Sequence, residues 1–251
     1  MTTGGERPFK DHFSGHAAAY AAFRPRYPDA LFAFLAGCVA ARRHAWDCGT
    51  GNGQTAVALA GHFERVTASD ASAAQIGAAT AHPKVEYRVA PAEASGLDDA
   101  CVDLVTVAQA LHWFDLDAFF AEARRVLVPG GVLAAWSYGL CTVDAGVDAV
   151  VNGLYRELDP WWPPERRLVD AGYRDVTLPF ARVEAPAFEM TAEWPANRML
   201  GYLRTWSACQ RCLADRGRDP VSAIEPALRA RWGEGPRTVR WPLALKVGRR
   251  E

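Results

Sequence analysis

The chain has 251 residues, of which half are hydrophobic and 23% are charged, and this composition is ordinary for a soluble globular protein. Its net charge of −1 gives the molecule as a whole no attraction to nucleic acid. No stretch approaches about 18 consecutive apolar residues, and residues 1–10 contain no apolar signal core. We therefore expect a cytoplasmic protein with no membrane span.

Charge is divided unevenly along the chain. Residues 1–160 contain 12 basic and 18 acidic residues, a net charge of −6, whereas residues 161–251 contain 16 and 11, a net charge of +5. The basic part favours an anionic substrate. Almost all of its basic residues are arginine in an alanine-rich chain, which is typical of a GC-rich genome, so nucleic acid is not the favoured partner. The six cysteines are scattered, with one close pair at Cys209 and Cys212, and predict no metal site.

The predicted elements begin with a loop and short helix that end at the breakers in residues 24–28, and Asp29 then caps a helix that runs to about Val39. Strand-like and helix-like segments alternate from there. The strands are predicted at His44–Cys48, Arg65–Ser69, Val85–Val89, Val102–Ala108 and Val132–Ser137, and the helices at Gln54–His62, Ser72–Thr80 and Leu116–Val126. This alternation predicts an α/β fold with a doubly wound sheet.

The pattern changes after Cys141, where tryptophan and proline become frequent. We predict helices at Ala196–Gly217 and Val221–Trp232, then a strand at Thr238–Val247 in which Pro242 indicates an edge or a bulge. The chain therefore divides as one domain, with N-terminal lid helices in 1–40, a cofactor-binding core in 41–140, a helical cap or acceptor region in 141–237 and a final strand in 238–251. The cap is expected over the carboxyl edge of the sheet.

A glycine-rich loop follows the first predicted strand. Gly49, Gly51 and Gly53 allow a sharp turn and a close approach of backbone amides to a ligand. A dinucleotide site requires the spacing Gly-x-Gly-x-x-Gly, which this loop lacks. The carboxylate of Asp47 would repel a pyrophosphate and attract an ammonium or sulfonium. The loop therefore favours an aminoacyl nucleoside.

Asp70 ends the second predicted strand, where its carboxylate could accept hydrogen bonds from two ribose hydroxyls. The same acid would serve NAD, so it indicates a nucleoside without separating the two cofactors. A helix N-cap for the segment that begins at Ala71 is the alternative.

From Ala45 to about Tyr138 the chain resembles the class I, S-adenosylmethionine-dependent methyltransferases with a methyltransferase type 11 domain. The resemblance rests on Trp46–Gly53, Ser69–Asp70, Ala92–Glu93, Asp103–Val105 and Leu127–Leu133. Three further segments are similar to the trans-aconitate methyltransferase-like subgroup, namely Phe13–Tyr20 with Phe23–Pro28, Gln109–Phe114 and Trp161–Arg166. The subgroup motifs do not fix the substrate.

The resemblance implies a seven-stranded Rossmann-like sheet that binds S-adenosyl-L-methionine. It implies that residues 47–53 contact the amino acid part of the cofactor and that Asp70 binds the ribose. Ala92 and Glu93 would lie at the adenine, although Pro91 stands where many relatives have an acid that bonds the adenine amino group. The residues implied near the methyl group are Gln109, Ala110 and Trp113, and those implied to close over the cofactor are Tyr20 and Arg24.

Methyl transfer needs alignment and desolvation more than a reactive side chain. His112 is the best candidate for a general base if the acceptor carries a proton, and a role in shaping the pocket is its alternative. If the acceptor is a carboxylate, no base is required and an arginine matters more. Trp113 is a candidate for cation–π contact with the sulfonium or for packing on the adenine. Trp161, Trp162 and Trp206 either line an acceptor pocket or pack the cap.

The sequence thus predicts a methyltransferase that acts on a small molecule, with a carboxylate as one candidate acceptor. The alternatives are an RNA methyltransferase, supported only by the basic C-terminal third, and a non-catalytic cofactor-binding protein of the same fold. An NAD oxidoreductase is disfavoured by the glycine spacing and Asp47.

Overall fold

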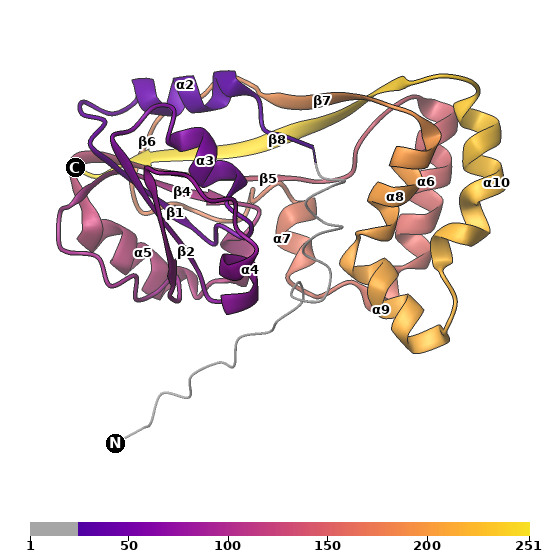
Figure 1. Cartoon of the computed structure of the whole chain (residues 1–251), viewed down its shortest axis with the longest axis horizontal. Helices are drawn as coiled ribbons and strands as arrows, with labels where there is room; N and C mark the ends of the chain where they lie inside the picture. The colour runs from indigo at the N-terminus through magenta and orange to yellow at the C-terminus, as the bar shows by residue number, and fades with distance from the viewer. Residues whose placement is uncertain (1–24) are drawn as a thin grey trace.

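A computed structural model of the chain describes residues 25–251. It contains a central sheet with helices on both faces, and a group of helices at one end (Figure 1). The predicted doubly wound α/β fold is confirmed. None of the helices in the described part of the chain is long and apolar enough to cross a membrane.

Five parallel strands form the larger part of the sheet. Four have bounds close to those predicted, and the fifth begins at Leu127 instead of Val132. The five strands are β1 (His44–Cys48), β2 (Arg65–Asp70), β3 (Val85–Val89), β4 (Val102–Ala108) and β5 (Leu127–Tyr138). Two further strands, β8 (Arg237–Arg249) and β6 (Ala181–Arg182), complete the order β3-β2-β1-β4-β5-β8-β6, in which β8 is antiparallel to both neighbours. The strand order reverses between β1 and β4, and ligands of such sheets bind at this switch point.

Each face of the sheet is covered by helices. On one face, α2 (Asp29–Gly37) and α3 (Gln54–Leu59) pack on small strand residues such as Ala45. On the other, α5 (Leu116–Val126) packs on the alternate residues, including Trp46. The shorter α4 (Ala73–Gly77) follows β2. Successive strand residues point to opposite faces, and all five residues of β1 are buried, so both of its faces are covered.

The region around α2 differs from prediction in two respects. The N-cap residue is Pro28, and Asp29 lies in the first turn instead of capping the helix. The helix also buries Leu31 and Leu35 against the face of the sheet, so this part of the predicted lid belongs to the core.

The segment 129–131, Pro-Gly-Gly, has a sequence typical of a turn but lies inside β5. The pairing of β4 with β5 shifts between Val102 and Leu104, which are opposite Leu127 and Val132, so the extra residues of β5 form a bulge. Gly130 adopts a φ of 77° there. A proline–glycine sequence that resembles a turn is thus accommodated as a local irregularity of a long strand.

The region between β5 and β8 contains more structure than was predicted. Its helices are α6 (Ala145–Glu157), η2 (Asp159–Trp161), α7 (Arg166–Asp170), α8 (Ala196–Arg204), α9 (Ser207–Arg216) and α10 (Pro220–Trp232), and it also contributes β6 and the strand β7 (Glu189–Trp194). The region is therefore not wholly helical. The single helix predicted at 196–217 is broken, because Trp206 adopts an extended conformation between α8 and α9.

Strand β8 connects the sheet to the cap, which we define as α6, α8, α9 and α10 (Figure 1). Its first part, Arg237–Pro242, pairs with β7, and its second part, Leu243–Arg249, pairs with β5. Pro242, which predicted an edge or a bulge, lies where the strand changes partner.

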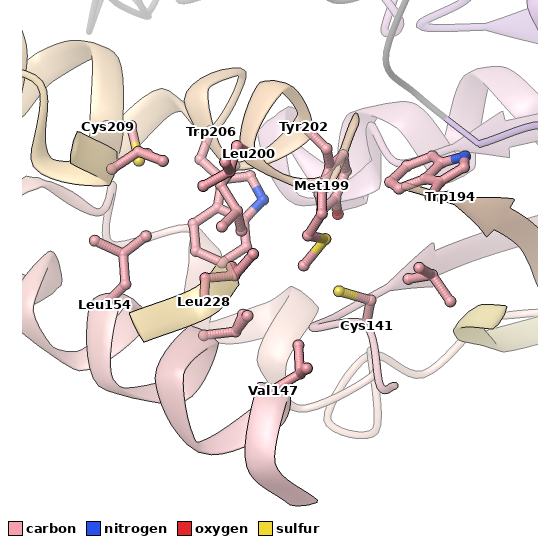
Figure 2. Close-up of a cluster of buried hydrophobic side chains, with 14 of the residues drawn as sticks. Cys141, Val147, Leu154, Trp194, Met199, Leu200, Tyr202, Trp206, Cys209 and Leu228 are labelled. Atoms are coloured by element: carbon pink, nitrogen blue, oxygen red, sulfur yellow. The ribbon is translucent and has the colours of Figure 1, made fainter. Parts of the chain in front are cut away.

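The cap has a hydrophobic core of its own that is continuous with the end of the sheet. Figure 2 shows Trp206, Met199 and Cys141 among its buried side chains. Trp241 of β8 is fully buried here, with its ring centroid 4.8 Å from that of Trp194 and 5.7 Å from that of Tyr202. Because one strand serves both cores, we expect them to unfold together.

The variant Trp241→Ala is expected to lower the free energy of unfolding by about 3–5 kcal/mol, because it leaves a large cavity where β8 meets the cap. Urea denaturation followed by circular dichroism measures this change. The control Leu213→Ala alters a side chain that is 39% exposed and is expected to change stability by less than about 0.5 kcal/mol. Equal effects of the two variants would contradict the role given to Trp241.

Candidate functional site

The glycine loop between β1 and α3 is fixed by its neighbours. Gly49, Gly51 and Gly53 have φ values of 69°, 56° and 85°, in the left-handed region that favours glycine. A Cβ on Gly49 would lie 2.5 Å from that of Ala110, and one on Gly53 would collide with the hydroxyl of Tyr87. At Gly51 the nearest atom would be a side-chain oxygen of Gln75, 3.8 Å away. The loop is thus packed at both ends and open at its middle.

Asp47 lies beneath this loop and is fully buried. One carboxylate oxygen accepts a hydrogen bond from Thr50 at 2.5 Å, and the other accepts one from Thr106 at 2.8 Å. The second contact follows from the sheet register, which places Thr106 of β4 opposite Asp47 of β1. Burial raises the pKa of Asp47 to about 7, although both hydroxyls act to lower it. The carboxylate therefore holds the loop, while its contact with a cofactor stays a prediction.

Asp70, at the end of β2, links the glycine loop to the segment that leads into α4. Its two oxygens accept hydrogen bonds from the backbone N–H groups of Gly51 and Ser72, each at 2.9 Å. The N-cap of α4 is Ser72, whose hydroxyl accepts from Gln75, so the alternative of Asp70 as N-cap is wrong. The carboxylate lies beside the middle of the glycine loop, as a group that binds a ribose would.

The predicted adenine residues lie at the same edge of the sheet. Ala92 is buried in one cluster with Cys48 and Ala110, and Glu93 accepts a hydrogen bond from the backbone N–H of Asp115 at 2.9 Å. Burial raises the pKa of the Cys48 thiol, and the charges of Asp47, Glu93 and Asp70 raise it further. Three carboxylates, from β1, from the end of β2 and from the loop after β3, thus lie near enough to act on this thiol.

Gln109 follows β4 with a φ of 56°, a conformation that is uncommon for a residue other than glycine. Its backbone N–H donates to the carbonyl of Trp136 and its side-chain amide to that of Tyr138, both at 2.9 Å. Such strain persists where the surroundings enforce it, and it is concentrated at functional sites. Here it turns the chain into the short helix η1 (Leu111–Trp113).

His112 lies in η1, with Nδ1 2.9 Å from the hydroxyl of Tyr173. Burial and, to a smaller extent, the charge of Arg166 lower the pKa of its imidazole to about 3, while Glu165 opposes the shift. His112 is therefore neutral at physiological pH. The ring of Trp113 lies 4.7 Å from that of His112.

A cleft lies at this edge of the sheet, between the segments that follow β4 and β5 and residues of the segment 162–207. From the sheet side it is lined by Gln109, His112, Trp113, Tyr138, Gly139 and Leu140, and from the opposite side by Trp162, Pro163, Arg166, Tyr202, Trp206 and Ser207. Trp162 and Trp206 line this cleft and also pack in the hydrophobic core of the cap, so both predicted positions apply to them and their contact with an acceptor stays a prediction. Trp161 instead donates a hydrogen bond from its indole nitrogen to Asp215, and its ring contacts the guanidinium of Arg216.

Arg166 is a cleft residue for which the sequence analysis predicted no role. Its Nε donates to Asp170 at 3.0 Å and to the hydroxyl of Tyr155 at 3.2 Å, and its guanidinium lies 5.0 Å from the ring of Trp162. Burial opposes its charge, but Tyr155 and Asp170 outweigh that effect and raise its pKa. The sequence feature that could have identified Arg166 is its position at the end of the segment Trp161–Arg166.

Two predicted cofactor residues, Tyr20 and Arg24, lie outside the described residues. Within 25–251, no three His, Cys, Asp or Glu side chains cluster as metal ligands would.

Comparison with known proteins shows that the part of the chain containing the glycine loop resembles one protein family. A family model described as a methyltransferase domain matches residues 46–135, from β1 into β5. A Dictyostelium discoideum protein described as a methyltransferase is 35% identical over 225 residues, which cover 88% of this chain and 86% of that protein. An uncharacterised methyltransferase of Mycobacterium tuberculosis is 36% identical over 122 residues, about half of each chain.

A solved structure from Anaeromyxobacter dehalogenans, described as a type II methyltransferase, is similar over nearly the whole chain. It is 53% identical, superposes with a TM-score of 0.85, and the match covers 90% of this chain and 98% of that one. The similarity thus includes the cap as well as the cofactor-binding core.

The variant Asp47→Asn is expected to flatten the pH dependence of stability. In the wild type the folded carboxyl keeps its proton up to about pH 7, whereas the unfolded one loses it near its ordinary pKa of 3.8. The folded state therefore binds more protons between these values, and its stability falls as pH rises through that range. An amide cannot ionise, so the melting temperature of the variant should rise relative to that of the wild type as the pH increases from 4 to 8. Parallel melting curves would contradict the raised pKa.

Proposed function

Because this chain belongs to the class I S-adenosylmethionine-dependent methyltransferases, we propose that it transfers a methyl group from S-adenosyl-L-methionine to a small molecule bound in the cleft. The observation that carries the proposal is the position of the cleft. It opens from the residues that follow β4 and β5, where Ala110 packs against the glycine loop at Gly49, and it is closed on its other side by aromatic residues. A cofactor at the switch point would thus have its acceptor beside it.

The residues at the carboxyl edge fit this cofactor. The open middle of the glycine loop, at Gly51, leaves backbone within reach of the amino acid part. Asp70 is suited to the ribose, and Ala92 and Glu93 to the adenine. We keep Tyr20 and Arg24 as proposed cofactor residues, together with Gln109, Ala110 and Trp113.

When bound, S-adenosylmethionine supplies a methyl group already activated on a sulfonium. The chain's own residues then have to align the acceptor with it and exclude water. Such positioning can contribute roughly 7–11 kcal/mol in favourable cases. Trp162 and Trp206 provide an apolar wall for this purpose, and Gln109 is held rigidly by its two hydrogen bonds.

A carboxylate is the acceptor class that the cleft favours. The Nε edge of Arg166 is occupied by Asp170 and Tyr155, but its two terminal nitrogens have no hydrogen-bond partner among the described residues. Its side chain is 22% exposed and lines the cleft. A guanidinium with a free fork matches the two oxygens of a carboxylate. A cytoplasmic location and the likeness to the trans-aconitate subgroup stay predictions from the sequence.

Titration calorimetry with S-adenosylhomocysteine, S-adenosylmethionine and NAD tests the cofactor. The wild type is expected to bind both adenosyl compounds and not NAD. Asp70→Ala should weaken this binding about 10- to 100-fold, the effect of losing hydrogen bonds to a charged group. Glu157→Ala, which changes an exposed residue at the end of α6, is the control and should bind as the wild type does. Failure of the wild type to bind either adenosyl compound would exclude the proposed function.

Arg166→Gln tests the acceptor class. With radiolabelled S-adenosylmethionine and a panel of small carboxylates, the variant is expected to raise KM for the acceptor about 10- to 100-fold, because the charge-assisted pair is lost. Its affinity for S-adenosylhomocysteine should stay unchanged. A wild type that methylates neutral acceptors and no carboxylate would contradict this assignment, and label transferred to RNA in a salt-dependent manner would favour the RNA alternative.

A further inference from the structure

Tyr173 lies directly behind His112 and is fully buried. It follows α7 in a tight turn, with a φ of 54° after Gly172 at 57°. A left-handed backbone at a large aromatic residue is unfavourable, so the surrounding structure must enforce it. The turn holds the phenolic hydroxyl 2.9 Å from Nδ1 of His112.

The phenolic hydroxyl has one hydrogen-bond partner in the described part of the chain, which is Nδ1 of His112. Burial raises the pKa of Tyr173, so the hydroxyl keeps its proton at neutral pH. The hydrogen bond therefore joins two groups that can each act as donor or acceptor.

The fully buried hydroxyl can donate its proton to Nδ1 or accept one from it. If Nδ1–H donated to the phenolic oxygen, the hydroxyl proton would lack an acceptor, because no other partner of Tyr173 occurs among the described residues. A buried donor without a partner costs free energy, so the first arrangement is favoured.

We propose that Tyr173 fixes His112 in the tautomer that carries its proton on Nε2, so that His112 presents a hydrogen-bond donor to the cleft and not a general base. Tyr173 is then a positioning residue that acts through His112. The proposal rests on the proposed function for its meaning in methyl transfer, although the tautomer itself can be measured without cofactor or acceptor.

The charges around His112 agree with a donor role. Arg166 lies in the same cleft and disfavours an imidazolium, and its effect exceeds the opposing one of Glu165. The cleft therefore contains a neutral N–H donor and a guanidinium fork. Both groups suit an acceptor that arrives with a free oxygen lone pair, as a carboxylate does. Neither group would remove the proton of a neutral alcohol or phenol.

The tautomer can be read by long-range ¹H–¹⁵N NMR of the ¹⁵N-labelled full chain, with His112 assigned by the signals that His112→Gln removes. The expected pattern is a protonated Nε2 and an unprotonated Nδ1, unchanged from about pH 5.5 to 8.5. His44 is an internal reference of the opposite tautomer, because its Nδ1 lies 3.1 Å from the carbonyl oxygen of Cys101 and must donate to it. A proton on Nδ1, or an imidazolium in this range, would overturn the proposal.

Tyr173→Phe tests the part played by the phenol. Without the donor to Nδ1, the His112 signals should move toward a mixture of both tautomers, while those of His44 stay in place and show that the fold is intact. If the signals of His112 also stayed in place, Tyr173 would not be what fixes the tautomer.

Kinetics distinguish the donor from the base. Glutamine can place an amide N–H near the position of Nε2, whereas leucine cannot. With a carboxylate acceptor, His112→Gln should therefore remain at least about tenfold more active than His112→Leu. A general base would instead make both variants equally poor, by about 10²- to 10⁴-fold, and would give the wild-type rate a pH inflection. A chain that fails to bind S-adenosylhomocysteine would refute the proposed function while leaving the NMR result to decide the tautomer.

Discussion

The pairing of β8 with two different partners is the constraint on which the cleft depends. One part of this strand completes the central sheet against β5, and the other part leaves the sheet with β7 and enters the cap. The buried ring of Trp241 then ties the strand to Trp194 and Tyr202. Since Tyr202 also lines the cleft, the wall of the acceptor site is held by the same contacts that hold the cap.

The cofactor side depends on a second buried interaction, between Asp47 and the hydroxyls of Thr50 and Thr106. A buried carboxylate is costly, and these two hydrogen bonds offset only part of the cost, as the raised pKa shows. A cation near the loop would compensate the remaining charge. This compensation agrees with the proposed binding of a sulfonium compound that also contains an ammonium group.

The acceptor side combines apolar walls with few polar groups. Arg166 keeps its charge through Asp170 and Tyr155, and His112 loses its charge through burial. The two side chains therefore offer a substrate different interactions: Arg166 offers a positive charge, and His112 offers a neutral imidazole. Alignment of an acceptor that is already nucleophilic requires no more than this, which agrees with the modest chemical demands of methyl transfer from a sulfonium.

The sequence by itself determined the parallel strands, the glycine loop and the family, because these depend on local patterns. Short apolar runs, turn glycines and an acid at a strand end are visible in neighbouring residues. It did not reveal α6, the break at Trp206 or the bulge at Gly130, which packing and strand register impose. Only the tertiary structure brought Arg166 and Tyr173 to His112, from segments more than 50 residues away in the chain. Long-range contacts of this kind leave no periodic signal in a single sequence, so the glycine loop and the acids at the strand ends could be predicted and the surroundings of His112 could not.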